Sequence, residues 1–395
     1  MKKAQGVLLP LLMFGCAGWL QASEDMTHKV LPGVVHLEGV GTVAVLGVQS
    51  DKVGDQDFKV VSGLAFGDVE AGLVNVSEIP LFSGKLSLST AVVNEVEVDT
   101  QYSRGTKTGT QYEQELKGFG QFANLKTHIN QQQYWYANLG VSLVSFGDYS
   151  LSNGETININ DEGLHDVFST LVSFGLATDE RKSFGDNSGL LASIELAGLL
   201  FRPGQSDQGQ VNYAASYRWA YEGGHSLTAY TKGSHGFVLA EKSEYDEVDE
   251  VRAEINGQCD ALTDASDKAN CSRLELELAN YIVDSNKKGN AQALGGAYGL
   301  RSFSEQYIKA ANTLLQGVEG AIRVPVSMGD GNSFELITFA ESAQANDDLA
   351  EIFDDSLYSV GLGARLNLKD TPVRLEVAYG GDNTESLILT AGKKW

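Results

Sequence analysis

The chain has 395 residues and a formal net charge of −23, with 44 glycines, 15 tyrosines and 16 phenylalanines against only 6 prolines. So acidic a chain excludes nucleic acid and an anionic membrane surface as its main partner, because both would repel it. The composition favours one large all-β unit over two ordinary domains.

The first residues, MKKAQGVLLPLLMFGCAGWLQASED, place two lysines before an apolar stretch and a small residue, Ala22, at a cleavage position. This pattern is typical of a secretory signal, so we expect residues 1–22 to be removed and residues 23–40 to form a short periplasmic segment. Cys16 leaves a lipoprotein signal open as an alternative, although Phe14 stands where a small residue is preferred. No later stretch reaches the roughly 18 apolar residues that a spanning helix needs.

From residue 41 onward, apolar and polar side chains alternate in segment after segment. In YWYANLGVSLVSF, for example, Trp135, Leu139 and Leu143 share one face, and Asn138 and Ser142 share the other. A period of two is the pattern of a half-buried strand. We predict strands at 41–50, 57–68, 70–79, 84–98, 116–130, 133–147, 164–179, 188–202, 210–222, 225–239, 314–328, 333–344, 356–368, 372–380 and 385–395.

A soluble sandwich would also show alternation, so the second face and the strand length decide the fold class. The polar face mixes Gly, Ser, Asn and Arg, and many segments run to ten or more residues, with aromatic residues near their ends. These features are typical of a transmembrane β-barrel with lipid outside and a wet lumen. We therefore predict an all-β outer-membrane barrel over residues 41–395, with about 16 antiparallel strands because an even number is usual.

One connection, residues 240–313, is long and acidic. Leu274, Leu278 and Ile282 fall at helical spacing within it. Cys259 and Cys271 are the two cysteines beyond the signal, and in an oxidising compartment they would form a disulfide. Zinc is the rival interpretation, but no histidine lies close enough in the sequence to complete a site. We expect no metal and no cofactor.

The order of segments near the C-terminus then becomes informative. GGAYGLRSFSEQ is followed by LLQGVEGAIRVPV, FELITFAESAQ, LYSVGLGARLNL and VRLEVAYG, and a last strand ends in Trp395. This order resembles the barrel of the superfamily that contains the BamA and TamA outer-membrane insertases and the FhaC and ShlB two-partner secretion transporters. The resemblance is best over residues 293–395.

In that superfamily a long loop folds back into the lumen, and its tip carries Val-Arg-Gly before Phe or Tyr. The matching residues are Leu300, Arg301, Ser302 and Phe303. The family arginine pairs with an acidic residue in a Phe-x-Asp-x-Gly pattern on a neighbouring strand, so the resemblance implies that Arg301 pairs with Glu341. Serine replaces glycine in the loop motif, and glutamate replaces aspartate in the strand motif.

The resemblance also implies a location, a mechanism and a set of partners. Location would be the outer membrane of a Gram-negative bacterium, and the mechanism would use a weak seam between the first and last strands, where an incoming strand can pair. The partners would be outer-membrane lipid, the assembly machinery that inserts this barrel by reading Trp395, and a secreted or membrane protein substrate. Family members carry periplasmic POTRA modules before the barrel, and we expect none here, because about twenty residues separate Ser23 from the first predicted strand.

Three functions follow as hypotheses. The first is assistance in the export or insertion of proteins or lipids at the outer membrane. The second is a passive pore or a structural surface barrel. The third, an enzyme, we do not expect, because the six histidines are scattered and adjacent strand residues such as His165 and Asp166 point to opposite faces.

Overall fold

The computed structural model describes most of the chain between residues 28 and 391. It leaves out residues 38–40, 51–58, 68–69, 105, 152–155, 158–166, 182–187, 201–204, 243–245, 256–258, 298, 304–306, 327–331, 369–370 and 382–383 within that range. The predicted signal with Cys16, the pair His165 and Asp166, and Trp395 all lie outside the described residues.

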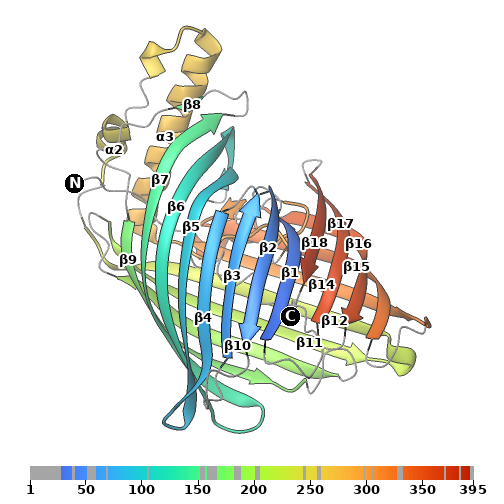
Figure 1. Cartoon of the computed structure of the whole chain (residues 1–395). Coiled ribbons are helices and arrows are strands. Elements are labelled where there is room, and N and C mark those ends of the chain that lie inside the picture. The colour runs from blue at the N-terminus through green and yellow to red at the C-terminus, as the bar shows by residue number, and fades with distance from the viewer. Residues whose placement is uncertain are drawn as a thin grey trace.

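The described strands form one sheet that curls into a barrel (Figure 1). Two of its 18 described strands, β8 (Thr156–Ile157) and β13 (Ile308–Lys309), are only two residues long, and the other sixteen each pair antiparallel with their neighbours. The long strands are β1 (His28–Leu37), β2 (Gly41–Ser50), β3 (Lys59–Gly67), β4 (Glu70–Leu81), β5 (Gly84–Ser103), β6 (Thr106–His128), β7 (Gln133–Leu151), β9 (Val167–Asp179), β10 (Gly189–Leu200), β11 (Asp207–Ala220), β12 (Ser226–Ala240), β14 (Asn312–Val324), β15 (Asn332–Asn346), β16 (Leu357–Leu368), β17 (Thr371–Gly380) and β18 (Glu385–Ala391). The predicted fold class is confirmed.

The predicted strands all appear, and the structure adds one that the sequence did not indicate. β1 occupies residues 28–37, within the segment that we expected to be a short periplasmic extension, and it pairs along its whole length with β2. Pro32 within it weakens the sequence pattern for a strand, because proline cannot donate a ladder hydrogen bond. A strand at the edge of a sheet tolerates proline, and β1 is such a strand.

Among the described residues, the seam between the first and last strands is the weakest pairing in the barrel. β1 and β18 share a single residue pair, His36 with Leu389, whereas β17 and β18 pair continuously from Val373 to Tyr379. The sheet is otherwise open along this seam, although β1 and β18 lie side by side (Figure 1). Within the described residues, this pair is the contact that joins the two strand edges.

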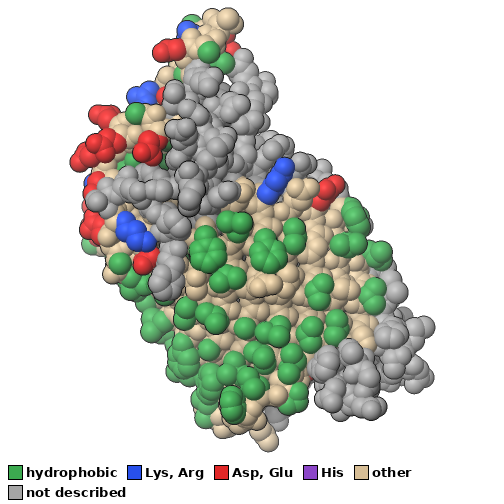
Figure 2. Space-filling model, turned by 60° about the vertical axis from the view of Figure 1, so that its left-hand side comes forward, with side chains coloured by type: hydrophobic (Ala, Val, Ile, Leu, Met, Phe, Trp, Pro, Cys, Tyr) green, Lys and Arg blue, Asp and Glu red, His purple; other side chains and the backbone are tan. Residues whose placement is uncertain are grey.

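The alternation predicted from the sequence sorts side chains to the two faces of the wall. Leu139, Ile194, Leu196 and Leu362 belong to the apolar parity and are more than half exposed on the outer surface. Figure 2 shows hydrophobic side chains over the barrel wall, while acidic and basic ones gather towards one end. An exposed apolar band of this kind is what hydrocarbon requires of a barrel exterior.

The insertion between β12 and β14 contains two helices, α2 (Val248–Ile255) and α3 (Ala265–Lys288), and a 3₁₀ turn, η3 (Cys259–Ala261). Asp264 caps α3 by accepting hydrogen bonds from the Ser266 and Asp267 amides, and Gly289 ends the helix with a positive φ of 80°. The helices stand at one end of the barrel, beside the long strands β5 to β7 (Figure 1). Among the described residues no helix is long and apolar enough to cross a membrane.

Because the outer face contacts lipid in this fold, a charge placed there should be costly. We expect Leu139→Arg to destabilise the barrel by about 2–4 kcal/mol if it lies near the bilayer midplane. Asn138→Arg, one residue away on the lumen face, should cost clearly less. The measurement is the urea midpoint of each variant in lipid vesicles, and equal losses for the two variants would contradict the assignment of faces.

Candidate functional site

After α3 the chain returns into the barrel as a loop, residues 289–311. Its backbone is folded on itself by the pairing of Leu294 with Ile308. Leu300 and Phe303 are fully buried and pack with Tyr230 of β12 and with neighbouring residues of β14 and β15. The prediction that this part of the insertion folds into the lumen therefore agrees with the described geometry.

Arg301 lies at the tip of this lumen loop and is completely buried. Its Nε is 2.9 Å from Oε1 of Glu341 on β15, and its backbone amide donates to Oε2 of the same carboxylate at 3.1 Å. The structure thus brings together the two residues that the family resemblance pairs. The guanidinium also lies 3.6 Å from the centre of the Phe339 ring, which is two residues before Glu341 on the same strand.

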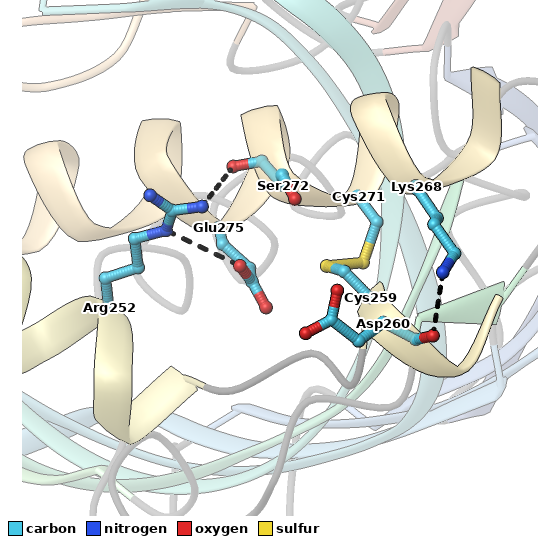
Figure 3. The surroundings of a disulfide bond; sticks show 7 residues. All are labelled: Arg252, Cys259, Asp260, Lys268, Cys271, Ser272 and Glu275. Atoms are coloured by element: carbon cyan, nitrogen blue, oxygen red, sulfur yellow. Dashed lines mark hydrogen bonds and ion pairs between the residues drawn. A yellow bond between two sulfur atoms is a disulfide. The ribbon is translucent and has the colours of Figure 1, made fainter. Parts of the chain in front are cut away.

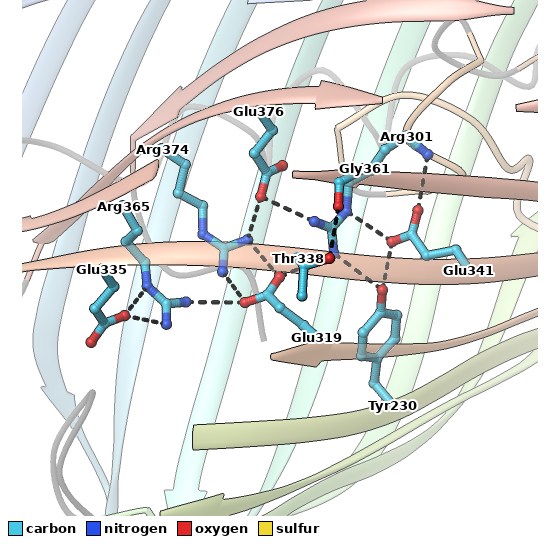
Figure 4. A network of polar contacts seen from close by, with 10 residues as sticks. All are labelled: Tyr230, Arg301, Glu319, Glu335, Thr338, Glu341, Gly361, Arg365, Arg374 and Glu376. Carbon is cyan, nitrogen blue, oxygen red and sulfur yellow. Dashed lines mark hydrogen bonds and ion pairs between the residues drawn. The ribbon is translucent and has the colours of Figure 1, made fainter. Parts of the chain in front are cut away.

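Three further groups complete the surroundings of this guanidinium (Figure 4). Nη1 donates to Glu376 on β17 at 3.0 Å, and Nη2 donates to Glu319 on β14 and to the Tyr230 hydroxyl, both at 3.1 Å. The Tyr230 hydroxyl donates in turn to Glu341 at 2.6 Å. Every nitrogen of the Arg301 side chain therefore has an acceptor, which is the condition for burying a charge.

The cluster continues along the inner wall through two more arginines. Arg374 of β17 contacts Glu319 at 2.6 Å and Glu376 at 3.3 Å. Arg365 of β16 contacts Glu319 at 3.1 Å and forms an ion pair with Glu335. Three arginines and four glutamates thus share one buried network, which we call the lumen charge cluster; it consists of Arg301, Glu319, Glu335, Glu341, Arg365, Arg374 and Glu376.

The charge on Arg301 is maintained by these carboxylates. Burial disfavours the charged form, but Glu341, Glu376 and Glu319 outweigh this effect and raise the pKa of Arg301 above its ordinary value. Arg301 is therefore a cation at neutral pH. Its attraction to the surrounding glutamates is weakly screened by salt, because the groups are buried.

The rest of the loop tip contacts the last strands. The Ser302 amide donates to the Ser359 hydroxyl on β16 at 3.1 Å, and the Ser386 hydroxyl on β18 donates to the Arg301 carbonyl. Together with the charge cluster, these contacts connect one loop to β12 and to every strand from β14 to β18. The loop tip therefore braces the C-terminal half of the wall.

The base of the same loop is held by a second set of charges. Arg104, in the turn between β5 and β6, pairs with Asp347 at 2.9 Å and donates to the Gly289 carbonyl at 2.9 Å. Lys288, at the end of α3, contacts Asp284 and Asp347. Although burial opposes it, hydrogen bonding to these two carboxylates raises the pKa of Lys288. The base of the loop is thereby attached to the β5–β6 hairpin.

Cys259 and Cys271 are joined as a disulfide with a Cα–Cα distance of 5.5 Å, which attaches η3 to α3 (Figure 3). Glu275 lies nearby and contacts Arg252 of α2 at 3.5 Å. These two cysteines and Glu275 are the group of side chains that could otherwise hold a metal ion in the described part of the chain. With both thiols in one bond, the zinc alternative has no thiolate ligands.

Sequence reasoning missed most members of the lumen charge cluster. Glu319, Glu335 and Tyr230 carried no signal as partners of the loop. Three charged residues stand on the polar face of their predicted strands: Arg365, Arg374 and Glu376. Charged side chains are rarely buried unless they are paired. Several charges facing one lumen could therefore have indicated a buried network, although not which residues meet.

The chain is similar in structure to several outer-membrane proteins. Over 93% of its length it matches BamA from Haemophilus ducreyi lacking POTRA domains 1–3, with a TM-score of 0.53, 13% identity and 70% of that chain covered. It also matches CdiB from Acinetobacter baumannii (TM-score 0.53, 10% identity) and CdiB from Escherichia coli (TM-score 0.54, 9% identity) over 93% and 94% of its length. It spans 60% and 63% of those two chains.

No protein-family model matches the sequence, and no curated protein matches it. At identities this low, the structural likeness defines the fold and leaves the activity open. The class that this chain falls into is therefore the outer-membrane β-barrel, of the form seen in BamA and CdiB.

Replacing Arg301 should unbalance the cluster. Arg301→Ala leaves three glutamates without their shared cation, so we expect a loss of about 3–5 kcal/mol in stability, together with release of the loop and higher ion conductance. Arg301→Lys keeps the charge but not the forked geometry and should show a smaller loss. Urea unfolding in vesicles and single-channel recordings measure the two effects, and unchanged conductance would remove the plugging role of the loop.

Removing the disulfide should act locally. In Cys259→Ser/Cys271→Ser the crosslink over a sequence separation of 12 residues is lost, which should lower the stability of the α2–η3–α3 unit by about 3 kcal/mol. Limited proteolysis of intact cells or vesicles should then cut the helical insertion faster. The barrel itself should keep its urea midpoint, and a parallel loss there would show that the insertion and the wall unfold together.

Proposed function

We propose that this protein assists the export or insertion of other proteins at the outer membrane of a Gram-negative bacterium, by receiving their strands at the seam between β1 and β18. The observation that carries the proposal is that one residue pair, His36 with Leu389, joins the described residues of β1 and β18. Unpaired donors and acceptors on two facing strand edges are the general requirement for adding a strand from another chain.

The surrounding geometry supports a seam that can open while the barrel persists. β18 is held on its other side by continuous pairing with β17, and Ser386 attaches it to the carbonyl of Arg301. β1 is likewise fully paired with β2. Within the part of the seam that the structure describes, separation of β1 from β18 therefore breaks one residue pair and leaves both flanking ladders intact.

The fold likeness to BamA and CdiB supports the same proposal, together with the resemblance of residues 293–395 to insertases and secretion transporters. The passive pore is the second hypothesis. The loop tip at Arg301, held by buried contacts to the C-terminal strands, argues against a permanently open channel through the lumen. Protein or lipid traffic through the seam does not require that loop to leave.

A crosslink across the seam tests the mechanism. We expect His36→Cys/Leu389→Cys to form a disulfide under oxidation, because the two positions face each other in register. The locked protein should lose function and recover it on reduction. The matched control is Val377→Cys/Leu387→Cys, which crosslinks the already continuous β17–β18 ladder and should stay active.

Function in this experiment is read from cells in which the wild-type protein has been depleted. The abundances of the other outer-membrane proteins, the secreted proteins and the surface lipids are compared between locked and reduced variants. Depletion that leaves all three unchanged would favour the passive barrel. A locked seam variant that complements as well as the control would reject strand exchange at this seam while leaving a role in export open.

A further inference from the structure

A pocket of about 350 Å³ lies on the inner wall formed by β6, β7 and β9 to β12. Its position is separate from the lumen charge cluster, whose acidic and basic residues come from the loop and from β14 to β17. The volume is at the lower end of the range of about 300–1,000 Å³ that is usual for small-molecule sites. The side chains that matter for its chemistry are Asn124, Lys126, Tyr134, Tyr136, Ser193 and Ser216.

Tyr136 supplies an aromatic platform in this pocket. Its ring lies against Gly175 of β9, where any Cβ would collide with the ring. The absence of a side chain at that position lets the ring lie on the barrel wall while it also lines the pocket. A second ring, Tyr134, has its centre 6.3 Å away. Flat rings presented in this way can contact the C–H face of a sugar, as they contact other apolar surfaces.

Several polar groups of the pocket have no partner within the described residues. The hydroxyls of Ser193 and Ser216 make no hydrogen bond there, although Ser216 is only 6% exposed. The Asn124 amide donates to Asn138 at 2.5 Å, and its carbonyl oxygen is left for another donor. Because these groups line the pocket, they are available to water or to a ligand rich in hydroxyls.

Lys126 is the charged side chain among the residues that line the pocket, in an otherwise acidic protein. Lys126 and Tyr136 face each other across β6 and β7, and the Lys126 ammonium lies 3.6 Å from the centre of the Tyr134 ring. Among the described residues Lys126 forms no ion pair. Of the nearby carboxylates, Glu78 is paired with Lys85 and Asp179 with Arg181 at 3.0 Å. Glu195 accepts from the Asn212 amide at 3.3 Å and hydrogen-bonds the Tyr136 hydroxyl, so an anionic group of a ligand must lie on the Lys126 side of the Tyr136 ring.

We propose that this pocket binds an acidic saccharide, with one sugar ring on Tyr136, its hydroxyls on Ser193, Ser216 and Asn124, and its carboxylate or phosphate on Lys126. The ring and the cation are direct neighbours on adjacent strands, so a single charged sugar can reach both. Two sources share this chemistry, a uronic acid unit of a polysaccharide and a phosphorylated sugar of a lipid headgroup. The site does not depend on the seam or on the proposed function.

The test is calorimetric titration of the purified, detergent-solubilised full chain. Digalacturonic acid and glucose 6-phosphate are the two acidic probes. Cellobiose has sugar rings but no charge, and inorganic phosphate has charge but no sugar ring, so the two serve as controls. We expect at least one acidic probe to bind with a Kd of about 1 mM or tighter. Cellobiose and inorganic phosphate should each bind at least about tenfold more weakly, and the preferred acidic probe identifies the source.

Variants assign the binding to this pocket. Lys126→Gln should remove the preference for acidic over neutral sugar, and Tyr136→Ala should weaken the acidic probe by about tenfold. Tyr213→Ala is the matched control, because Tyr213 covers Gly233 in the same manner but belongs to the outward-facing parity of β11. Absence of binding by both acidic probes at about 10 mM, equal binding of inorganic phosphate, or an equal loss in Tyr213→Ala would overturn the proposal.

Discussion

The structure depends on one requirement, that a guanidinium buried inside the barrel must find an acceptor for each of its three nitrogens. Arg301 meets that requirement with Glu319, Glu341 and Glu376, which lie on three different strands, and with the hydroxyl of Tyr230. Because the acceptors come from separate strands, the loop holds those strands in one arrangement. An ion-pair network of this kind contributes less to net stability than to the choice of a single arrangement, since each charge also costs desolvation free energy.

The distribution of contacts along the barrel is uneven. The C-terminal strands are paired continuously and are also braced from inside by the loop, whereas the described residues of β1 and β18 meet at one residue pair. A barrel held in this way can lose the contact between β1 and β18 without losing the register of the strands beside it. The lumen loop holds the C-terminal strands together, and the seam beside them is weakly paired. A strand of another protein could therefore pair at the seam without disturbing the register of the other strands.

Most strands of the fold could be predicted from the sequence. Of the three ion pairs that hold Arg301, one could be predicted. The alternation identified fifteen of the long strands, and the family resemblance paired Arg301 with Glu341, which the structure places 2.9 Å apart. β1 was missed because Pro32 interrupts its pattern, although an edge strand tolerates proline. Glu319 and Glu376 were not predicted as partners, because they lie 18 and 75 residues from Arg301 in the sequence and only strand register brings them close.

By itself the sequence determined which side chains face lipid and which face the lumen, because a period of two sets the face of each residue independently of its neighbours. It also determined that residues 240–313 leave the sheet, since the alternation stops there. Only the tertiary structure decided which inward residues meet across the wall, how the loop tip is held, and how little joins β1 to β18. Those outcomes depend on the register of adjacent strands and on the curvature of the whole sheet, which no single segment encodes.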